Sequence, residues 1–152
     1  MIACARLLRL STPMLLLVLA GCADSGPTCG AVSAGPGTPS IELTSVPPIG
    51  STANLKGQVL HVAPTNYFVA VYIYVPNGGG WWIKPYFTSP DTMLNCGGTF
   101  SAEIVTGGED ADATIITAFV LPSGYSPPLL DGAATLPQSL YSAAVATATA
   151  NR

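Results

Sequence analysis

The segment 81–87 carries the residues whose types and spacing are best suited to binding chemistry. It reads WWIKPYF, and successive side chains of a strand point to opposite faces. If Ile83 faces a core, Trp82, Lys84 and Tyr86 lie together on the other face. Two aromatic rings beside one ammonium group suit a sugar, because the C–H face of the sugar stacks on the rings while the charged group bonds its hydroxyl groups. The alternative for such amphipathic side chains is packing within the domain or contact with another molecule.

The other aromatic residues near this segment divide between the same two faces. Trp81 and Phe87 share the core side with Ile83, whereas Tyr72 and Tyr74 on a neighbouring strand extend the aromatic face. The predicted glycan-binding face therefore comprises Trp82, Tyr86, Lys84, Tyr72 and Tyr74.

Three acidic residues lie close together in one expected turn and could bind a metal ion: Glu109, Asp110 and Asp112. Calcium takes about six to eight oxygen ligands, and the spacing of these acids completes no calcium loop. Calcium binding is thus an open alternative to a turn that is merely solvated. His61 is the sole histidine, and a metal site built on it would need further ligands around it. We predict that the protein has no resident metal and no cofactor.

The same residues offer little for catalysis. A Ser–His–Asp triad would depend on His61 alone, and no serine lies in the sharp strand-to-helix turn of a hydrolase nucleophile. Glu103 and the acidic turn are formally a carboxylate pair of the kind that cleaves glycosidic bonds, but a small sandwich offers little cleft between them. We therefore predict that the protein is not an enzyme.

The N-terminal residues form an export signal that ends at a cysteine. Arg6 and Arg9 precede the apolar run 14–19, which is too short to span a bilayer and has the length of the apolar part of a secretory signal. The run closes on LAGC, which is similar to the lipobox of bacterial lipoproteins, so we expect residues 1–21 to be removed and Cys22 to be acylated. The acylated cysteine would hold the protein on a lipid bilayer. An ordinary signal peptide followed by a chance cysteine is the alternative.

Two cysteines are left once Cys4 departs with the signal and Cys22 carries the lipid. They are Cys29 and Cys96. Export places both in an oxidising compartment, where a disulfide between them is expected. Free or mispaired thiols are the alternative.

The exported chain divides into a tether and one domain. Residues 22–40 are rich in Gly, Pro, Ser and Thr, which is typical of a flexible linker, and residues 41–152 are enough for one core. Removal of the two arginines of the signal changes the formal charge from −3 to −5, because all eight acidic residues follow Cys22. A surface so poor in Lys and Arg neutralises few phosphates, which excludes nucleic acid as a partner.

Short runs with strand character follow one another through the domain, each bounded by Pro or Gly. The clearest is 67–75, which has β-branched residues on one face and mainly aromatic residues on the other. The expected strands are 41–46, 55–62, 67–75, 81–87, 99–105, 112–121 and 143–150, with a short helix from Gln138 as the alternative for the last. This spacing predicts an all-β fold, an immunoglobulin-like antiparallel β-sandwich of about seven strands.

The domain also contains the stretches SVPPIGSTANLKGQV, YFVAVYIYV, GWWIKPYF, GGTFSAEIVTGGEDADAT and AFVLPSGYSPP. Together they resemble the β-sandwich modules that lie beside catalytic domains in some bacterial glycoside hydrolases. The resemblance implies an immunoglobulin-like fold and an accessory, non-catalytic role outside the cell. Cys96-Gly97 is a departure, because polar residues are expected at these two positions.

These observations predict an extracytoplasmic lipoprotein that is held at the outer membrane or cell surface and binds a polysaccharide as an accessory module. Ala23, and not the Asp associated with retention in the inner membrane, follows the lipidated cysteine. The alternative is a structural or protein-interaction lipoprotein of the cell envelope, in which the aromatic strand docks a partner protein and binds no sugar.

Overall fold

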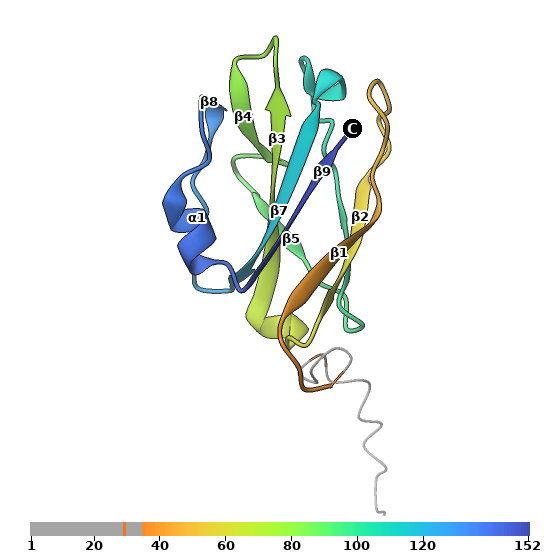
Figure 1. Cartoon of the computed structure of the whole chain (residues 1–152), viewed down its shortest axis with the longest axis vertical. Helices are drawn as coiled ribbons and strands as arrows, with labels where there is room; N and C mark the ends of the chain where they lie inside the picture. Colours follow the sequence, from red (N-terminus) through yellow and green to blue (C-terminus); the bar gives the residue numbers. More distant parts are fainter. Residues whose placement is uncertain (1–28, 30–34) are drawn as a thin grey trace, which may run out of the picture.

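The runs of β-branched and aromatic residues between Pro and Gly form strands that pair into two antiparallel sheets, shown in Figure 1. The computed structural model describes Cys29 and residues 35–152. The expected signal peptide 1–21, the expected lipid acceptor Cys22 and most of the tether 22–40 therefore lie outside the described residues. Within them the chain is an all-β sandwich, as predicted.

The elements are β1 (Ser40–Ser45), β2 (Leu55–Leu60), the 3-10 turn η1 (Pro64–Asn66), β3 (Tyr67–Val75), β4 (Gly80–Lys84), β5 (Asp91–Met93), β6 (Thr99–Ala102), the 3-10 turn η2 (Asp110–Asp112), β7 (Ile115–Pro122), β8 (Asp131–Ala133), α1 (Gln138–Ala143) and β9 (Ala146–Asn151).

The two sheets differ in size. The smaller has the order β1-β2-β6, and the larger has the order β8-β4-β3-β7-β9 with β5 also paired to β3. β3 is nine residues long and pairs with β4, β5 and β7, so it is the centre of the larger sheet. β9 at one edge of the larger sheet contacts β1 of the smaller, which brings the two sheets together on that side.

The alternation along β3 builds two layers of core. Val69, Val71 and Ile73 face the smaller sheet, where they meet buried residues of β2 and β6. Phe68 and Tyr72 point to the opposite face and belong to a second buried cluster. These side chains are at most 2% exposed, so the larger sheet is covered on both faces along β3. The predicted division of this strand into two faces is confirmed.

The second face is covered by the segment that connects β7 to β9. This segment contains α1, whose Leu140 is fully buried and packs in the same cluster as Phe119 of β7. In Figure 1 α1 lies beside the larger sheet, on the side away from β1 and β2. In the part of the chain that the structure describes, no helix is long and apolar enough to cross a membrane.

The described strands number nine, and the prediction of about seven is therefore too low. The two that were missed, β5 and β8, have three residues each and read DTM and DGA, which is too short for any alternation to show. The chain end combines both predicted alternatives, because the helix α1 begins at Gln138 and the strand β9 follows it.

The chain that precedes β1 meets the sandwich at the end shown at the bottom of Figure 1. Cys29 forms a disulfide with Cys96, which lies between β5 and β6, and the two Cα atoms are 4.5 Å apart. His61 Nδ1 lies 3.1 Å from the carbonyl oxygen of Gly35. The predicted disulfide is confirmed, and it fastens part of the predicted tether to the sandwich.

Candidate functional site

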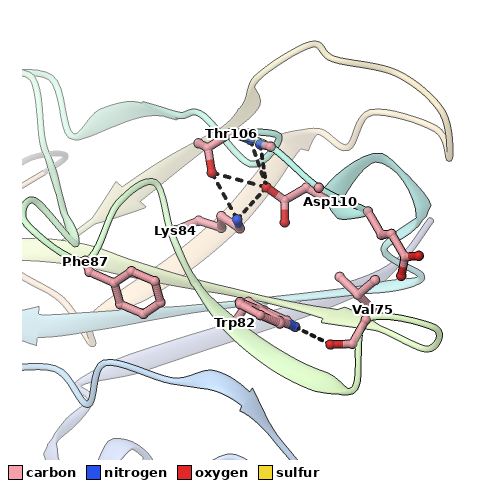
Figure 2. Close-up of a pocket in the computed structure, with 10 residues that line it drawn as sticks. Val75, Trp82, Lys84, Phe87, Thr106 and Asp110 are labelled. Carbon is pink, nitrogen blue, oxygen red and sulfur yellow. Dashed lines mark hydrogen bonds and ion pairs between the residues drawn. The ribbon is translucent and has the colours of Figure 1, made fainter.

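A pocket of about 370 Å³ opens where β4 faces the segment between β6 and β7. One wall comes from the β3–β4 hairpin, β4 and the residues after it, and the other comes from 106–110. The side chains that matter below are Val75, Trp82, Lys84, Phe87, Thr106 and Asp110. In Figure 2 the ring of Trp82 lies between Phe87 and Val75, and Lys84 extends toward Thr106 and Asp110.

A buried ion pair between Lys84 and Asp110 joins the two walls. Lys84 Nζ is 2.5 Å from Asp110 Oδ2, and the two residues are 5% and 6% exposed. Lys84 Nζ also donates a hydrogen bond to Thr106 Oγ1 at 3.0 Å. Lys84 is buried because its face of β4 is directed toward the smaller sheet, and a buried ammonium group needs such partners to offset its lost hydration.

The chain at 106–110 folds around the Asp110 carboxylate. Oδ2 accepts hydrogen bonds from the backbone N–H groups of Thr106 and Gly107, at 2.9 and 3.1 Å, and from the Thr106 hydroxyl at 3.1 Å. Gly108 has a φ of +53°, a conformation that glycine adopts without cost and that lets the chain turn into η2. One carboxylate therefore shapes the loop and neutralises the lysine.

Trp82 is held in place before any ligand arrives. Its ring is half-buried and packs against the inter-sheet core. Its Nε1–H donates to the carbonyl oxygen of Gly78 in the β3–β4 hairpin at 3.1 Å. A Cβ at Gly78 would come within 2.8 Å of Val75, so the hairpin approaches the strand closely only with glycine there.

The second aromatic residue of the pocket is Phe87 and not Tyr86. β4 ends at Lys84, because Pro85 lacks the N–H that a strand ladder requires, and the alternation stops there. Phe87 is 44% exposed and lines the pocket, so the expectation that it faces the core is wrong. Tyr86 is 47% exposed, and its hydroxyl donates to Glu103 Oε2 at 3.2 Å. This hydrogen bond raises the pKa of Tyr86.

Tyr72 and Tyr74 do not extend the face that holds Trp82. In the β3–β4 pairing Tyr74 is opposite Trp81, and their ring centroids are 5.5 Å apart, whereas Ile73 is opposite Trp82. Tyr72 is fully buried, its hydroxyl donates to the carbonyl oxygen of Pro128 at 2.9 Å, and burial raises its pKa. The structure thus keeps Trp82 and Lys84 together and separates the two tyrosines from them.

The three acids of the predicted turn have different neighbours. Asp110 is paired with Lys84, and Glu109 Oε2 lies above Gly78, 3.5 Å from the position a Cβ would take. Asp112 is exposed. Among the described residues no three His, Cys, Asp or Glu side chains come together as a site for a metal ion.

No family model, curated protein or solved structure matches this chain. The function of the protein must therefore be inferred from the geometry of the pocket, its ion pair and the sequence.

Arg152 fixes the end of the pocket loop at Asp110 and Ala113, a role that no sequence pattern indicates. Its guanidinium group donates to five backbone carbonyl oxygens, those of Pro47, Pro48, Ser51, Asp110 and Ala113, at 2.8–3.4 Å. The first three belong to the β1–β2 connection and the last two to the region of η2, so one side chain fastens the pocket loop to the smaller sheet. Burial lowers the pKa of Arg152, and the nearby charge of Asp112 opposes this effect.

The ion pair leaves hydrogen-bonding capacity for a ligand. An ammonium group has three N–H donors, and Lys84 uses two of them on Thr106 and Asp110. Asp110 Oδ1 accepts no hydrogen bond within the described residues, and Figure 2 shows this oxygen directed away from Thr106, toward the side on which Trp82 lies. One donor and one acceptor thus remain beside two aromatic rings.

Proposed function

We propose that this protein is an exported, lipid-anchored lipoprotein whose sandwich is a non-catalytic module that binds glycans in the pocket between Trp82 and Phe87. The observation that carries the proposal is the combination of two aromatic side chains with a fixed donor and acceptor in one hollow. Sugars present apolar C–H faces and hydroxyl groups together, so their recognition calls for both kinds of contact.

The size and rigidity of the pocket support this reading. Its volume of about 370 Å³ is at the small end of the roughly 300–1,000 Å³ that ligand pockets occupy, and it suits a short saccharide. The Trp82 ring and the Lys84–Asp110 pair are already fixed by hydrogen bonds within the protein, which reduces the entropy lost when a ligand binds.

The two ends of the sandwich suit a module that is held on a membrane. The disulfide lies at the end where the chain enters, and the β3–β4 hairpin and η2, which contribute to the pocket, lie at the other end in Figure 1. The nine residues of β3 span about 30 Å between these ends. Cys29 follows Cys22 by only seven residues, so an acyl group on Cys22 keeps the disulfide end near the bilayer and directs the hairpin outward.

The test is affinity electrophoresis of the folded domain, residues 29–152, through gels that contain a panel of soluble polysaccharides. We expect at least one polysaccharide to retard the wild-type protein and Phe87→Ala to lose most of that retardation, because the ring is a wall of the pocket. Tyr86→Ala is the matched control, since Tyr86 is adjacent and equally exposed but does not line the pocket.

Two outcomes would contradict the proposal. One is that no polysaccharide retards the wild type, which would favour the alternative of a protein-interaction lipoprotein of the envelope. The other is that Tyr86→Ala abolishes retardation while Phe87→Ala does not, which would place any binding outside the pocket.

The anchor has a separate test. Cys22→Ser in the full chain removes the thiol that receives the lipid, so we expect the variant to remain unprocessed or to leave the membrane fraction. Metabolic labelling with a radioactive fatty acid, followed by membrane fractionation, checks this result. Normal processing and membrane retention of the variant would refute lipid anchoring at this residue.

A further inference from the structure

The charged groups that line the pocket leave it with a net negative charge. The charge of Lys84 is offset by Asp110 at 2.5 Å. Glu109 also lines the pocket, and it forms no ion pair with any residue that the structure describes. One carboxylate is therefore free to interact with a ligand.

The position of Glu109 places this free charge at the end of the pocket formed by the β3–β4 hairpin. Glu109 Oε2 is 3.5 Å from the Cβ position at Gly78, and the carbonyl oxygen of the same glycine accepts the hydrogen bond from Trp82 Nε1. The carboxylate thus lies at the hairpin end of the pocket, over the glycine whose carbonyl group holds Trp82 in place. A cation bound at this end of the pocket is attracted by the carboxylate.

We infer that the pocket selects glycans that carry a free, positively charged amino group, such as oligomers of glucosamine. This inference rests on the proposed function, since it names the class of sugar that the same pocket takes. The sugar ring lies against Trp82 and Phe87, its hydroxyl groups meet the unused donor of Lys84 and the unused acceptor of Asp110, and its ammonium group lies beside Glu109.

The same charges act against the other main classes of glycan. Uronic acids and sulfated sugars bring a negative charge toward Glu109, and Lys84 is already neutralised by its partner. An N-acetylated sugar is neutral, so it keeps the aromatic contacts and loses the attraction to Glu109. The expected order of affinity is amino sugar first, N-acetylated sugar second and acidic sugar last.

Isothermal titration with three soluble oligosaccharides of equal length tests this order: a glucosamine oligomer, its fully N-acetylated counterpart and a galacturonic acid oligomer. Attraction of a cation to an exposed carboxylate predicts a preference of about three- to fivefold for the first over the second. Glu109→Gln should reduce this ratio to about twofold or less, because only the carboxylate charge is removed.

Glu103→Gln is the matched control, because it removes an exposed carboxylate that does not line the pocket. It should leave the ratio of the two affinities unchanged. The inference is overturned if the N-acetylated or the acidic oligomer binds as tightly as the glucosamine oligomer, or if Glu103→Gln lowers the ratio as much as Glu109→Gln. Those results leave glycan binding intact, whereas failure of all three oligomers and of the polysaccharide panel contradicts the proposed function itself.

Discussion

The two faces of the larger sheet carry neighbouring residues of the same two strands, yet one face is closed and the other opens into a pocket. On the closed face Trp81 packs beside Tyr74, and Tyr72 donates its hydroxyl hydrogen to Pro128 in the covering segment. On the open face Trp82 lines the pocket, and Lys84 contacts the loop 106–110 through Asp110. The difference lies in what covers each face, since the aromatic content is similar.

The covering layers differ in how closely they follow the sheet. On the closed face the side chains of Leu130, Leu136 and Leu140 from the covering segment pack in the same cluster as Ile83, so the covering layer lies directly on the sheet. On the open face β6 ends at Ala102, and the chain that continues from it reaches Lys84 only at Thr106 and Asp110. A pocket remains because the loop meets β4 through the polar contacts of Lys84 with Thr106 and Asp110 and not through a continuous apolar layer.

The largest expected effect comes from breaking that ion pair. Lys84→Met leaves the buried Asp110 carboxylate without its charge partner, which should lower the free energy of unfolding by about 3–5 kcal/mol. The loop 106–110 should also lose its fixed position, so glycan retardation should disappear. Urea unfolding followed by tryptophan fluorescence measures the first effect, and affinity electrophoresis measures the second.

The double variant Lys84→Met/Asp110→Leu separates these two effects. Replacing both partners by apolar side chains avoids an unpaired buried charge, so part of the lost stability should return. The backbone N–H groups of Thr106 and Gly107 lose their acceptor, which keeps the recovery incomplete. Glycan retardation should remain absent, because the unused donor and acceptor are gone. A stable double variant that binds glycans normally would show that the ion pair has no part in recognition.

The next effect in size belongs to the closed face. Leu140→Ala truncates the fully buried side chain by which α1 packs on the sheet. This should lower the free energy of unfolding by about 2–5 kcal/mol, because apolar burial is lost and a cavity is left. Binding should be unchanged at temperatures where the variant is folded. A loss of affinity in the folded variant would contradict the separation of the two faces.

The smallest effect concerns Tyr72, whose pKa is raised by burial. The folded state therefore holds this proton more tightly than the unfolded state, and its contribution to stability is complete below the ordinary tyrosine pKa of about 10 and declines as pH rises above it. Tyr72→Phe should cost about 1 kcal/mol at neutral pH, through the lost hydrogen bond to Pro128, and should make the alkaline decline shallower. Unfolding curves at a series of pH values check this, and an unchanged alkaline decline would mean that Tyr72 does not titrate as described.

Alternation in the sequence was enough to predict much of the fold, because it is a local property. The two faces of β3 are visible within a stretch of nine residues. The disulfide could be predicted from the expected export of the chain and from the two cysteines that the expected signal and lipid anchor leave. By contrast β5 and β8 have three residues each, and such lengths contain no periodic signal.

The candidate site was predicted less well, because it depends on contacts between distant residues. Lys84 was expected on an exposed face, and its burial follows from Asp110, which lies 26 residues later. Arg152 donates a hydrogen bond to the carbonyl oxygen of Pro47, which lies 105 residues earlier, and no sequence pattern predicts such a contact. Phe87 could have been predicted in part, since proline cannot donate to a strand ladder and Pro85 therefore ends the alternation before Phe87.

The central claim, that the open face is the binding face, has a direct test in the two tryptophans, one on each face. The indole N–H signals of Trp81 and Trp82 are resolved by ¹H–¹⁵N NMR and assigned with Trp81→Phe. Titration with the polysaccharide or oligosaccharide that binds most tightly should shift the Trp82 signal, because its N–H lies at the pocket wall, and should leave the Trp81 signal in place. A ligand that binds and shifts only Trp81, or neither signal, would contradict the account.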